Sequence, residues 1–189
     1  MTLRPRARRC AFTLVETVIV VALSVSVLIA IILLIYNFNK ISVYDKTSAQ
    51  SSGSASALMR EIESLASPAD AVLQTHAFSG STRISSSTAL VLEIPSIDSS
   101  GNVVANTYDY AAFYSTGANA YRLLETNALS KRSPGTKQLS STINFLTFSY
   151  DGFSFATTST VTVDIQTQAR AKQEVLSDHL REQIRLRNY

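Results

Sequence analysis

The chain has 189 residues, of which 46% are hydrophobic, and its formal net charge of +3 comes from four arginines in residues 1–11, a segment without an acidic residue. Outside that segment 13 basic side chains stand against 14 acidic ones, so the basicity is local and does not indicate a nucleic-acid-binding surface. The single cysteine, Cys10, precedes the long apolar segment, which excludes a domain stabilised by disulfides.

The first predicted element is an apolar helix near the N-terminus. Residues 17–39 contain no charged residue, and Ser24 and Ser26 are polar near the middle. Twenty helical residues at ~1.5 Å each span ~30 Å, the thickness of a bilayer's hydrocarbon core. The span also lacks the polar stripe of a helix that lies on a soluble domain. Because only Lys40 and Lys46 follow it closely, the positive-inside rule predicts a single-pass protein with its N-terminus in the cytoplasm.

The order of parts at the start of this helix differs from that of a secretory signal. An ordinary signal has its small-residue cleavage site after the apolar core, whereas Ala11 precedes the core here. The residues that follow it are Phe12, Thr13, Leu14, Val15 and Glu16. This pattern resembles the leader of type IV prepilins and type II secretion pseudopilins, which has a basic segment, a small residue and Phe-Thr-Leu-x-Glu before an apolar helix. The family usually has glycine where Ala11 stands; alanine is the mildest replacement, so cleavage is still expected.

The resemblance implies roles for three residues. Cleavage after Ala11 leaves Phe12 as the new N-terminus, whose amine the family's peptidase also methylates. A lone carboxylate in hydrocarbon costs at least about 3 kcal/mol, so Glu16 needs a partner. In the family that partner is the terminal amine of a neighbouring subunit, engaged as the helices bundle into a filament. Without the resemblance, Glu16 can equally well lie at the cytoplasmic headgroups, because it is close to the helix start.

Past the apolar span the sequence stays compatible with a helix. An apolar stripe at helical spacing is formed by Ala55, Leu58, Ile62 and Leu65. Pro68 supplies a stop, and an unbroken helix over residues 12–66 would be ~80 Å long. A bend at Gly53 and a flexible serine-rich linker over residues 47–57 are the alternatives. The stripe favours the helix, with its outer half packed on a head domain.

Downstream, the hydrophobic period changes from 3.6 to 2. Half-buried antiparallel strands joined by short turns are predicted over residues 88–94, 107–114, 121–125, 143–150 and 160–168. Pro95 indicates a sheet edge or a strand end. About 140 residues follow the apolar span, enough for one domain with a core.

The predicted fold is therefore α+β, with a long N-terminal hydrophobic helix packed on a C-terminal antiparallel β-sheet head. Residues 1–11 form the leader. Residues 12–66 form the stalk helix, whose membrane part covers about 12–38, and residues 67–189 form a β-rich globular head.

The C-terminal tail is ambiguous, and both helix and strand stay open for residues 172–187. A helix fits the spacing of Val175, Leu176, Leu180 and Ile184. A strand fits the alternation of apolar residues and arginines over residues 184–187, and J-type minor pseudopilins and related minor pilins often end in a similar strand. A short helix or loop followed by a final strand is the preferred interpretation.

Few side chains can carry catalysis or bind a metal. His76 and His179 form no His-x-x-x-His pair, and the sequence has no nucleophile elbow and no phosphate loop. The aspartates considered as calcium ligands, because some pseudopilins bind calcium in loops, are Asp98, Asp109, Asp151 and Asp164. The first and third lie in turn sequences, where aspartate bonds to the local backbone, and the others fall on the outward phase of strands. No metal site and no cofactor is predicted.

Two further groups of side chains have ordinary structural explanations. A ligand-stacking platform is conceivable for Tyr108, Tyr110, Tyr114 and Tyr121. Positions in the core or facing the helix are the preferred explanation for these tyrosines. The arginines Arg181, Arg185 and Arg187 alternate with acidic residues and indicate a solvated face, not a nucleic-acid groove.

These patterns predict a structural protein and not an enzyme: a minor subunit of a type IV pilus or a type II secretion pseudopilus. Ala11, Phe12 and Glu16 are its processing and assembly residues. The implied partners are a prepilin peptidase, other pilins or pseudopilins, a membrane assembly platform with its ATPase, and the lipid bilayer, with no direct nucleic acid. The expected location is the inner or cytoplasmic membrane and then the filament.

The alternative is an uncleaved bitopic membrane protein whose extracytoplasmic β-domain senses or binds a ligand. The sequence leaves open whether a filament would serve secretion, adhesion, motility or DNA uptake. It also leaves open the position of the subunit in that filament and the presence of a calcium site.

Overall fold

One long α-helix, ten strands and a short 3-10 helix are the regular elements of the described part of the chain, residues 13–171 and 174–187, in the computed structural model. The long helix is α1 (Leu14–Ala66), and the 3-10 helix is η1 (Phe155–Thr157). The strands are β1 (Ala71–Val72), β2 (Thr75–Phe78), β3 (Ser81–Ile84), β4 (Ala89–Ile97), β5 (Val103–Thr116), β6 (Asn119–Glu125), β7 (Gly135–Ser140), β8 (Ile143–Tyr150), β9 (Thr160–Ala171) and β10 (Glu174–Arg185). The predicted α+β class is confirmed, because a long N-terminal helix packs on antiparallel sheets.

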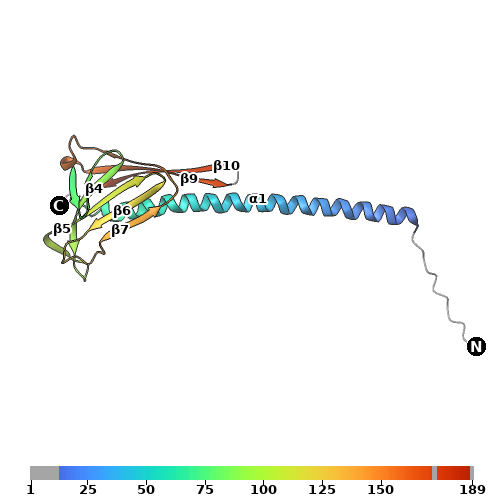
Figure 1. Cartoon of the computed structure of the whole chain (residues 1–189), viewed down its shortest axis with the longest axis horizontal. Helices are drawn as coiled ribbons and strands as arrows, with labels where there is room; N and C mark the ends of the chain where they lie inside the picture. Colours follow the sequence, from blue (N-terminus) through green and yellow to red (C-terminus); the bar gives the residue numbers. More distant parts are fainter. Residues whose placement is uncertain (1–12, 172–173, 188–189) are drawn as a thin grey trace, which may run out of the picture. The chain divides into compact units, whose positions relative to one another are not determined.

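Contacts divide the chain into two compact units, Met1–Tyr44 and Asp45–Tyr189. In the first unit the described residues belong to the N-terminal part of α1, and their apolar side chains are exposed. The second, which we call the C-terminal unit, contains the end of α1 and every strand. Figure 1 shows α1 as a single helix that belongs to both units.

The serine-rich part of α1 is helical, so the linker interpretation of residues 47–57 is wrong and the helix is not broken at Gly53. Its serines bond to strands of the C-terminal unit. The hydroxyl pairs are Ser51–Thr167 at 2.8 Å and Ser54–Ser140 at 2.7 Å, and the hydroxyl of Ser52 donates to Asp178. Serine is a weak helix former, but these tertiary contacts outweigh its local preference.

All strand pairs in the C-terminal unit are antiparallel. One sheet has the order β1-β4-β5-β6-β7, a second has the order β10-β9-β8, and β2 and β3 form a separate hairpin. Strands at all five predicted positions are present. The hydrophobic alternation also places the side chains as expected: Val161, Val163 and Ile165 are fully buried on one face of β9.

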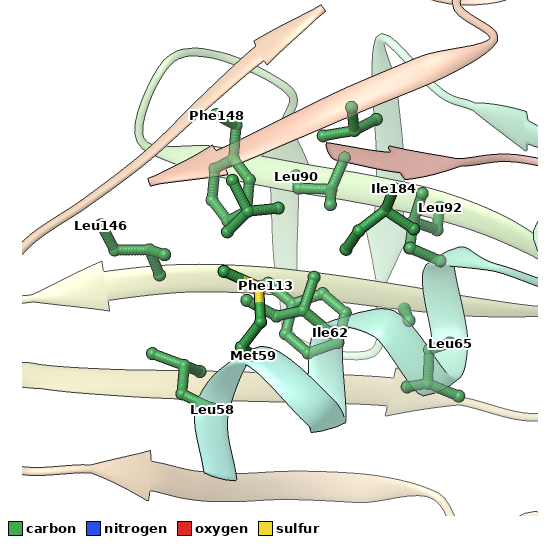
Figure 2. Packing of buried hydrophobic residues seen from close by; sticks show 14 of the residues in the cluster. Leu58, Met59, Ile62, Leu65, Leu90, Leu92, Phe113, Leu146, Phe148 and Ile184 are labelled. Carbon is green, nitrogen blue, oxygen red and sulfur yellow. The ribbon is translucent and has the colours of Figure 1, made fainter. Parts of the chain in front are cut away.

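The last turns of α1 fill the space between these sheets. Figure 2 shows Leu58, Met59 and Ile62 pointing from the helix into one cluster with residues of both sheets. The strand residues labelled there are Leu90, Leu92, Phe113, Leu146, Phe148 and Ile184. Each fully buried side chain of this size stabilises the fold by roughly 1.5–3 kcal/mol. The apolar stripe in the sequence therefore identified the helix face that the core uses.

The structure corrects the tail and adds strands that the sequence did not predict. Residues 174–185 form β10 throughout, so the preferred short helix or loop before a final strand is wrong, and the strand alternative holds. β10 pairs with β9 over twelve residues, which fixes the extended form. The unpredicted strands β1, β2, β3 and β7 are short, and they carry too weak an alternation to be recognised. Pro95 lies near the end of β4, where the register with β5 shifts.

Candidate functional site

The residues predicted for processing and assembly are partly within the described chain. Ala11 and Phe12 lie outside the described residues. Glu16 lies in the first turn of α1 and is exposed. Within residues 13–171 and 174–187, no ion pair involves its carboxylate.

Thr13 caps the start of α1. Its hydroxyl oxygen accepts a hydrogen bond from the backbone N–H of Glu16 at 3.3 Å, and its carbonyl accepts from Thr17 at 3.2 Å. Threonine followed three residues later by glutamate is the sequence of a capping box, in which a carboxylate also favours the positive end of the helix dipole. The bond observed here is the one to the Glu16 backbone, and the carboxylate contributes through its place at the positive end of the helix dipole.

The apolar part of α1 is long and apolar enough to cross a membrane. The large apolar side chains from Leu14 to Ile41 are each about half exposed or more. The two serines in its middle satisfy their hydroxyls within the helix, because Ser24 donates to the carbonyl of Val20 at 2.8 Å and Ser26 donates to that of Ala22 at 2.9 Å. Lipid can therefore surround this segment without leaving a hydroxyl unpaired.

Asp109 contradicts the prediction that it faces solvent, because it is fully buried. Its carboxylate accepts four hydrogen bonds. Oδ2 accepts from Ser130 Oγ and Arg132 Nη1, both at 2.6 Å, and Oδ1 accepts from Ser96 Oγ and the Asn127 N–H, both at 2.9 Å. Burial by itself raises the pKa of Asp109, but these donors outweigh burial and hold the pKa below its usual value. The group fastens the segment between β6 and β7 to β4 and β5.

Asp98 and Asp151 confirm the prediction that they bond to the local backbone. Asp98 Oδ1 accepts the N–H groups of Ser100 and Asn102, at 2.8 and 2.9 Å, in the turn between β4 and β5. Asp151 Oδ1 accepts those of Ser159 and Thr160, both at 2.9 Å. Hydrogen bonds from Ser159 and Thr160 lower the pKa of Asp151 to about 2. This aspartate therefore closes the loop between β8 and β9.

At position 152, next to Asp151, the loop has room for glycine but not for a residue with a Cβ. A Cβ there would lie 2.8 Å from backbone atoms of Ser154, Thr157 and Thr158. We expect Gly152→Ala to lower the free energy of unfolding by about 1–3 kcal/mol, because the loop must open to admit the methyl group. Urea titration of the full chain in detergent, followed by tyrosine circular dichroism, measures the loss.

The matched control for this prediction is Gly53→Ala. Gly53 lies inside α1, where an added Cβ would meet no side chain beyond its chain neighbours and no other element within 4 Å. Alanine is the better helix former by about 1 kcal/mol, so this variant should gain stability. Equal responses of the two variants would show that the crowding at Gly152 has no energetic consequence.

The tyrosines of β5 and β6 do not face the helix, which corrects that part of the prediction. On β5 the residues that join the helix-side core are Ala111 and Phe113, and Tyr110 packs on the opposite face. The β2–β3 hairpin contacts this opposite face. His76 stacks on Tyr110 with ring centroids 3.8 Å apart, and the Arg83 guanidinium lies 3.8 Å from the Tyr114 ring centroid. Tyr110 and Tyr114 thus hold the hairpin in place, a role that could not be predicted because neither strand of the hairpin was predicted.

Each of the two histidines lies beside a carboxylate, His76 of β2 beside one on β6 and His179 of β10 beside one on β9. His76 Nε2 is 3.5 Å from Glu125 Oε2, and His179 Nε2 is 2.6 Å from Asp164 Oδ1. The second pair is half exposed, so Asp164 belongs to the solvated face as predicted. Arg181, on the same strand as His179, is exposed as expected.

One further charged group joins helix and sheet and was not foreseen. Glu61 of α1 accepts from Arg122 Nη1 at 2.5 Å and lies 3.4 Å from Lys137 Nζ. The three residues are far apart in sequence, so no local pattern could reveal them. Among the described residues, no group of three His, Cys, Asp or Glu side chains could hold a metal ion.

No family model, no curated protein and no solved structure matches this chain.

Proposed function

We propose that this chain is a minor structural subunit of a type IV pilus or a type II secretion pseudopilus. The observation that carries the proposal is the sequence Phe-Thr-Leu-x-Glu, residues 12–16, at the start of a 53-residue helix whose first half is apolar and whose last turns pack in a β-sheet unit. Support comes from the combination: a small residue before the motif, a segment able to cross a bilayer, and a folded unit at the other end of the same helix.

In this proposal the parts of the chain have separate tasks. A prepilin peptidase cuts after Ala11 and methylates the amine of Phe12. The apolar helix holds the subunit in the membrane and then packs against the helices of other pilins or pseudopilins, driven by an assembly platform and its ATPase. The carboxylate of Glu16 receives the terminal amine of a neighbour, an arrangement that fixes axial register. The C-terminal unit is exposed outside the membrane.

The cleavage site provides the direct test. Co-expression with a prepilin peptidase should give a chain that starts at Phe12 with an extra methyl group, read by mass spectrometry of the N-terminal peptide. Ala11→Leu should block cleavage almost completely, because a peptidase that cuts at this junction needs a small side chain there. Ala11→Gly, the residue usual in the family, should be cut at least as well as the wild type.

An intact arginine-rich leader on the wild-type chain would contradict the proposal. It would favour the alternative, an uncleaved membrane anchor that tethers a sensing or ligand-binding β-domain. Cleavage of Ala11→Leu at the wild-type rate would show that the cut lies elsewhere.

A further inference from the structure

β10 leaves one of its edges without a partner strand in the described part of the chain. It is the terminal strand of the sheet β10-β9-β8, and it is drawn in red in Figure 1. Its pairing with β9 runs through twelve consecutive residues without a register shift. Edge strands in soluble proteins are usually short, bulged or interrupted by proline, and β10 is none of these. Its outer edge can therefore form a regular backbone ladder with another strand.

The hydrogen bonds at the end of β10 show which backbone groups point to this edge. Leu186 donates its N–H to Ser159 on the β9 side, at 2.8 Å, and Arg187 donates in the other direction, to Ala69, at 3.2 Å. Successive residues of a strand alternate in direction, so the odd-numbered residues from 175 to 185 direct their N–H and C=O groups away from β9. The N–H of His179 agrees, because it bonds to the side chain of Asp178 at 3.0 Å and not to β9.

Charge on β10 is sorted by the same alternation. The even-numbered charged residues, whose neighbours on β9 include the buried Val163 and Thr167, are all acidic: Glu174, Asp178 and Glu182. The odd-numbered ones, on the opposite face, are all basic or histidine: His179, Arg181 and Arg185. Residues opposite each other in an antiparallel pair share a face. A strand that adds to this edge therefore meets arginines on the outer face and carboxylates on the inner face.

This sorting disfavours antiparallel pairing of two β10 strands. Two copies joined edge to edge would place even residues opposite even ones and odd opposite odd, in every register. No register then places an arginine opposite an acid, and several registers place acids opposite acids or arginines opposite arginines, which is destabilising. The edge thus has protection against a second copy, but none against a strand of complementary charge.

Arg181 and Arg185 are available to such a strand. Both are exposed, and within residues 13–171 and 174–187 neither forms an ion pair. Thr160 lies opposite Arg185, so β9 offers it no carboxylate. Arg181 lies opposite Asp164, whose carboxylate is already bonded to His179.

We propose that the β10 edge binds an extended segment of another protein by strand addition, and that this segment carries two acidic side chains four residues apart. Four residues is the separation of Arg181 and Arg185, so both acids lie on the outer face opposite an arginine. The main chain of the segment bonds to the odd-numbered residues of β10, and the acids set its register. This inference concerns the C-terminal unit alone and does not depend on the proposed filament.

Fluorescence anisotropy of a labelled peptide with the full chain in nonionic micelles tests the proposal. The probe is a ten-residue threonine–valine peptide with two glutamates four residues apart, and the control peptide has them three apart, on opposite faces. The first peptide should bind roughly threefold to tenfold more tightly than the second. Gln183→Pro removes one edge N–H without touching β9 and should weaken binding about tenfold, whereas Gln183→Thr should not.

Three results would overturn the proposal. The first is equal binding of the two peptides, and the second is equal binding by Gln183→Pro and Gln183→Thr when both keep the wild-type circular dichroism. The third is a dimer in sedimentation that Gln183→Pro abolishes, since the occupant of the edge would then be a second copy. If Gln183→Pro does not fold, Arg185→Glu replaces it, and unchanged binding of the glutamate peptide to that variant also refutes the proposal.

Discussion

Replacing Asp109 by alanine is expected to lower the free energy of unfolding of the C-terminal unit by about 3–5 kcal/mol. The variant leaves the guanidinium of Arg132, whose side chain is only 13% exposed, without its carboxylate. It also removes the acceptor of the Ser96 and Ser130 hydroxyls and of the Asn127 N–H. Arg132 keeps its bond to the carbonyl of Pro95 at 2.7 Å, which alone does not neutralise the charge. Urea titration of the full chain in detergent, followed by the tyrosine signal, measures the effect.

Asp164→Ala is the matched control, because it removes a carboxylate of the same type from a half-exposed pair with His179. Exposed pairs contribute up to about 1 kcal/mol, so this loss should be several times smaller. Similar losses in the two variants would contradict the view that burial decides the effect.

The same carboxylate predicts the direction of a pH dependence. The folded-state pKa of Asp109 is below its usual value, so its contribution is complete above the unfolded-state pKa of about 3.9 and is lost as the pH falls through the folded-state pKa. When the pH is lowered from about 4, the free energy of unfolding should fall more for the wild-type chain than for Asp109→Ala. A parallel acid response of the two proteins would refute the assignment to Asp109.

Replacing Glu16 by alanine is expected to abolish most co-purification with partner pilins, as long as the chain is in fact a filament subunit. The change improves the fit of the segment to hydrocarbon, so membrane insertion should be kept. The neighbouring amine would be left buried without its carboxylate, at a cost of several kcal/mol, about 3–5 in a fully buried pair. The measurement compares recovery of partner subunits from membranes for wild type and variant, after mass spectrometry has shown equal processing.

Glu16→Gln separates assembly from helix capping. Glutamine at this position keeps the capping pattern with Thr13 but has no charge. If the charge serves assembly, Glu16→Gln should fail like Glu16→Ala. If capping is the whole role of Glu16, Glu16→Gln should assemble normally, and the proposed amine–carboxylate pairing would be wrong. A subunit at the tip of a filament would retain part of its assembly, because it has no neighbour above it.

The strands and the helix face of the core followed from the sequence because a buried face leaves a repeating pattern. Leu58 and Ile62 on α1 and Val161, Val163 and Ile165 on β9 repeat with the periods of their elements. A buried apolar face can be recognised from a local repeat in the sequence, although the residues that it packs against lie far away in the chain. For the same reason the end of α1 at Ala66, two residues before Pro68, was predictable.

What the sequence did not reveal depends on partners that only the fold brings together. The alternation predicted that Asp109 faces outward, opposite to the tyrosines of β5. In the structure Asp109 lies on the same face as Ala111 and Phe113, and Arg132 and Ser130 from a loop beyond the next strand enclose it. The serines of α1 resemble a linker because the strands that bond to them come more than 80 residues later. For the N-terminal motif, the part of the site that the structure describes is the cap at Thr13 and the exposed Glu16, and its role in assembly stays a prediction.

The bonds between the ends of the C-terminal unit have a consequence for the order of folding. Ser51 pairs with Thr167 across 116 residues, and the cluster on the last turns of α1 is completed by Ile184 and Leu186. Because these contacts span nearly the whole unit, the loop-closure entropy must be overcome before they stabilise anything, and folding should be slow for a unit of this size. During synthesis, the face of α1 that carries Leu58 and Ile62 is not fully covered until β10 has left the ribosome. Apolar surface exposed in this way on a nascent chain is a target for chaperones.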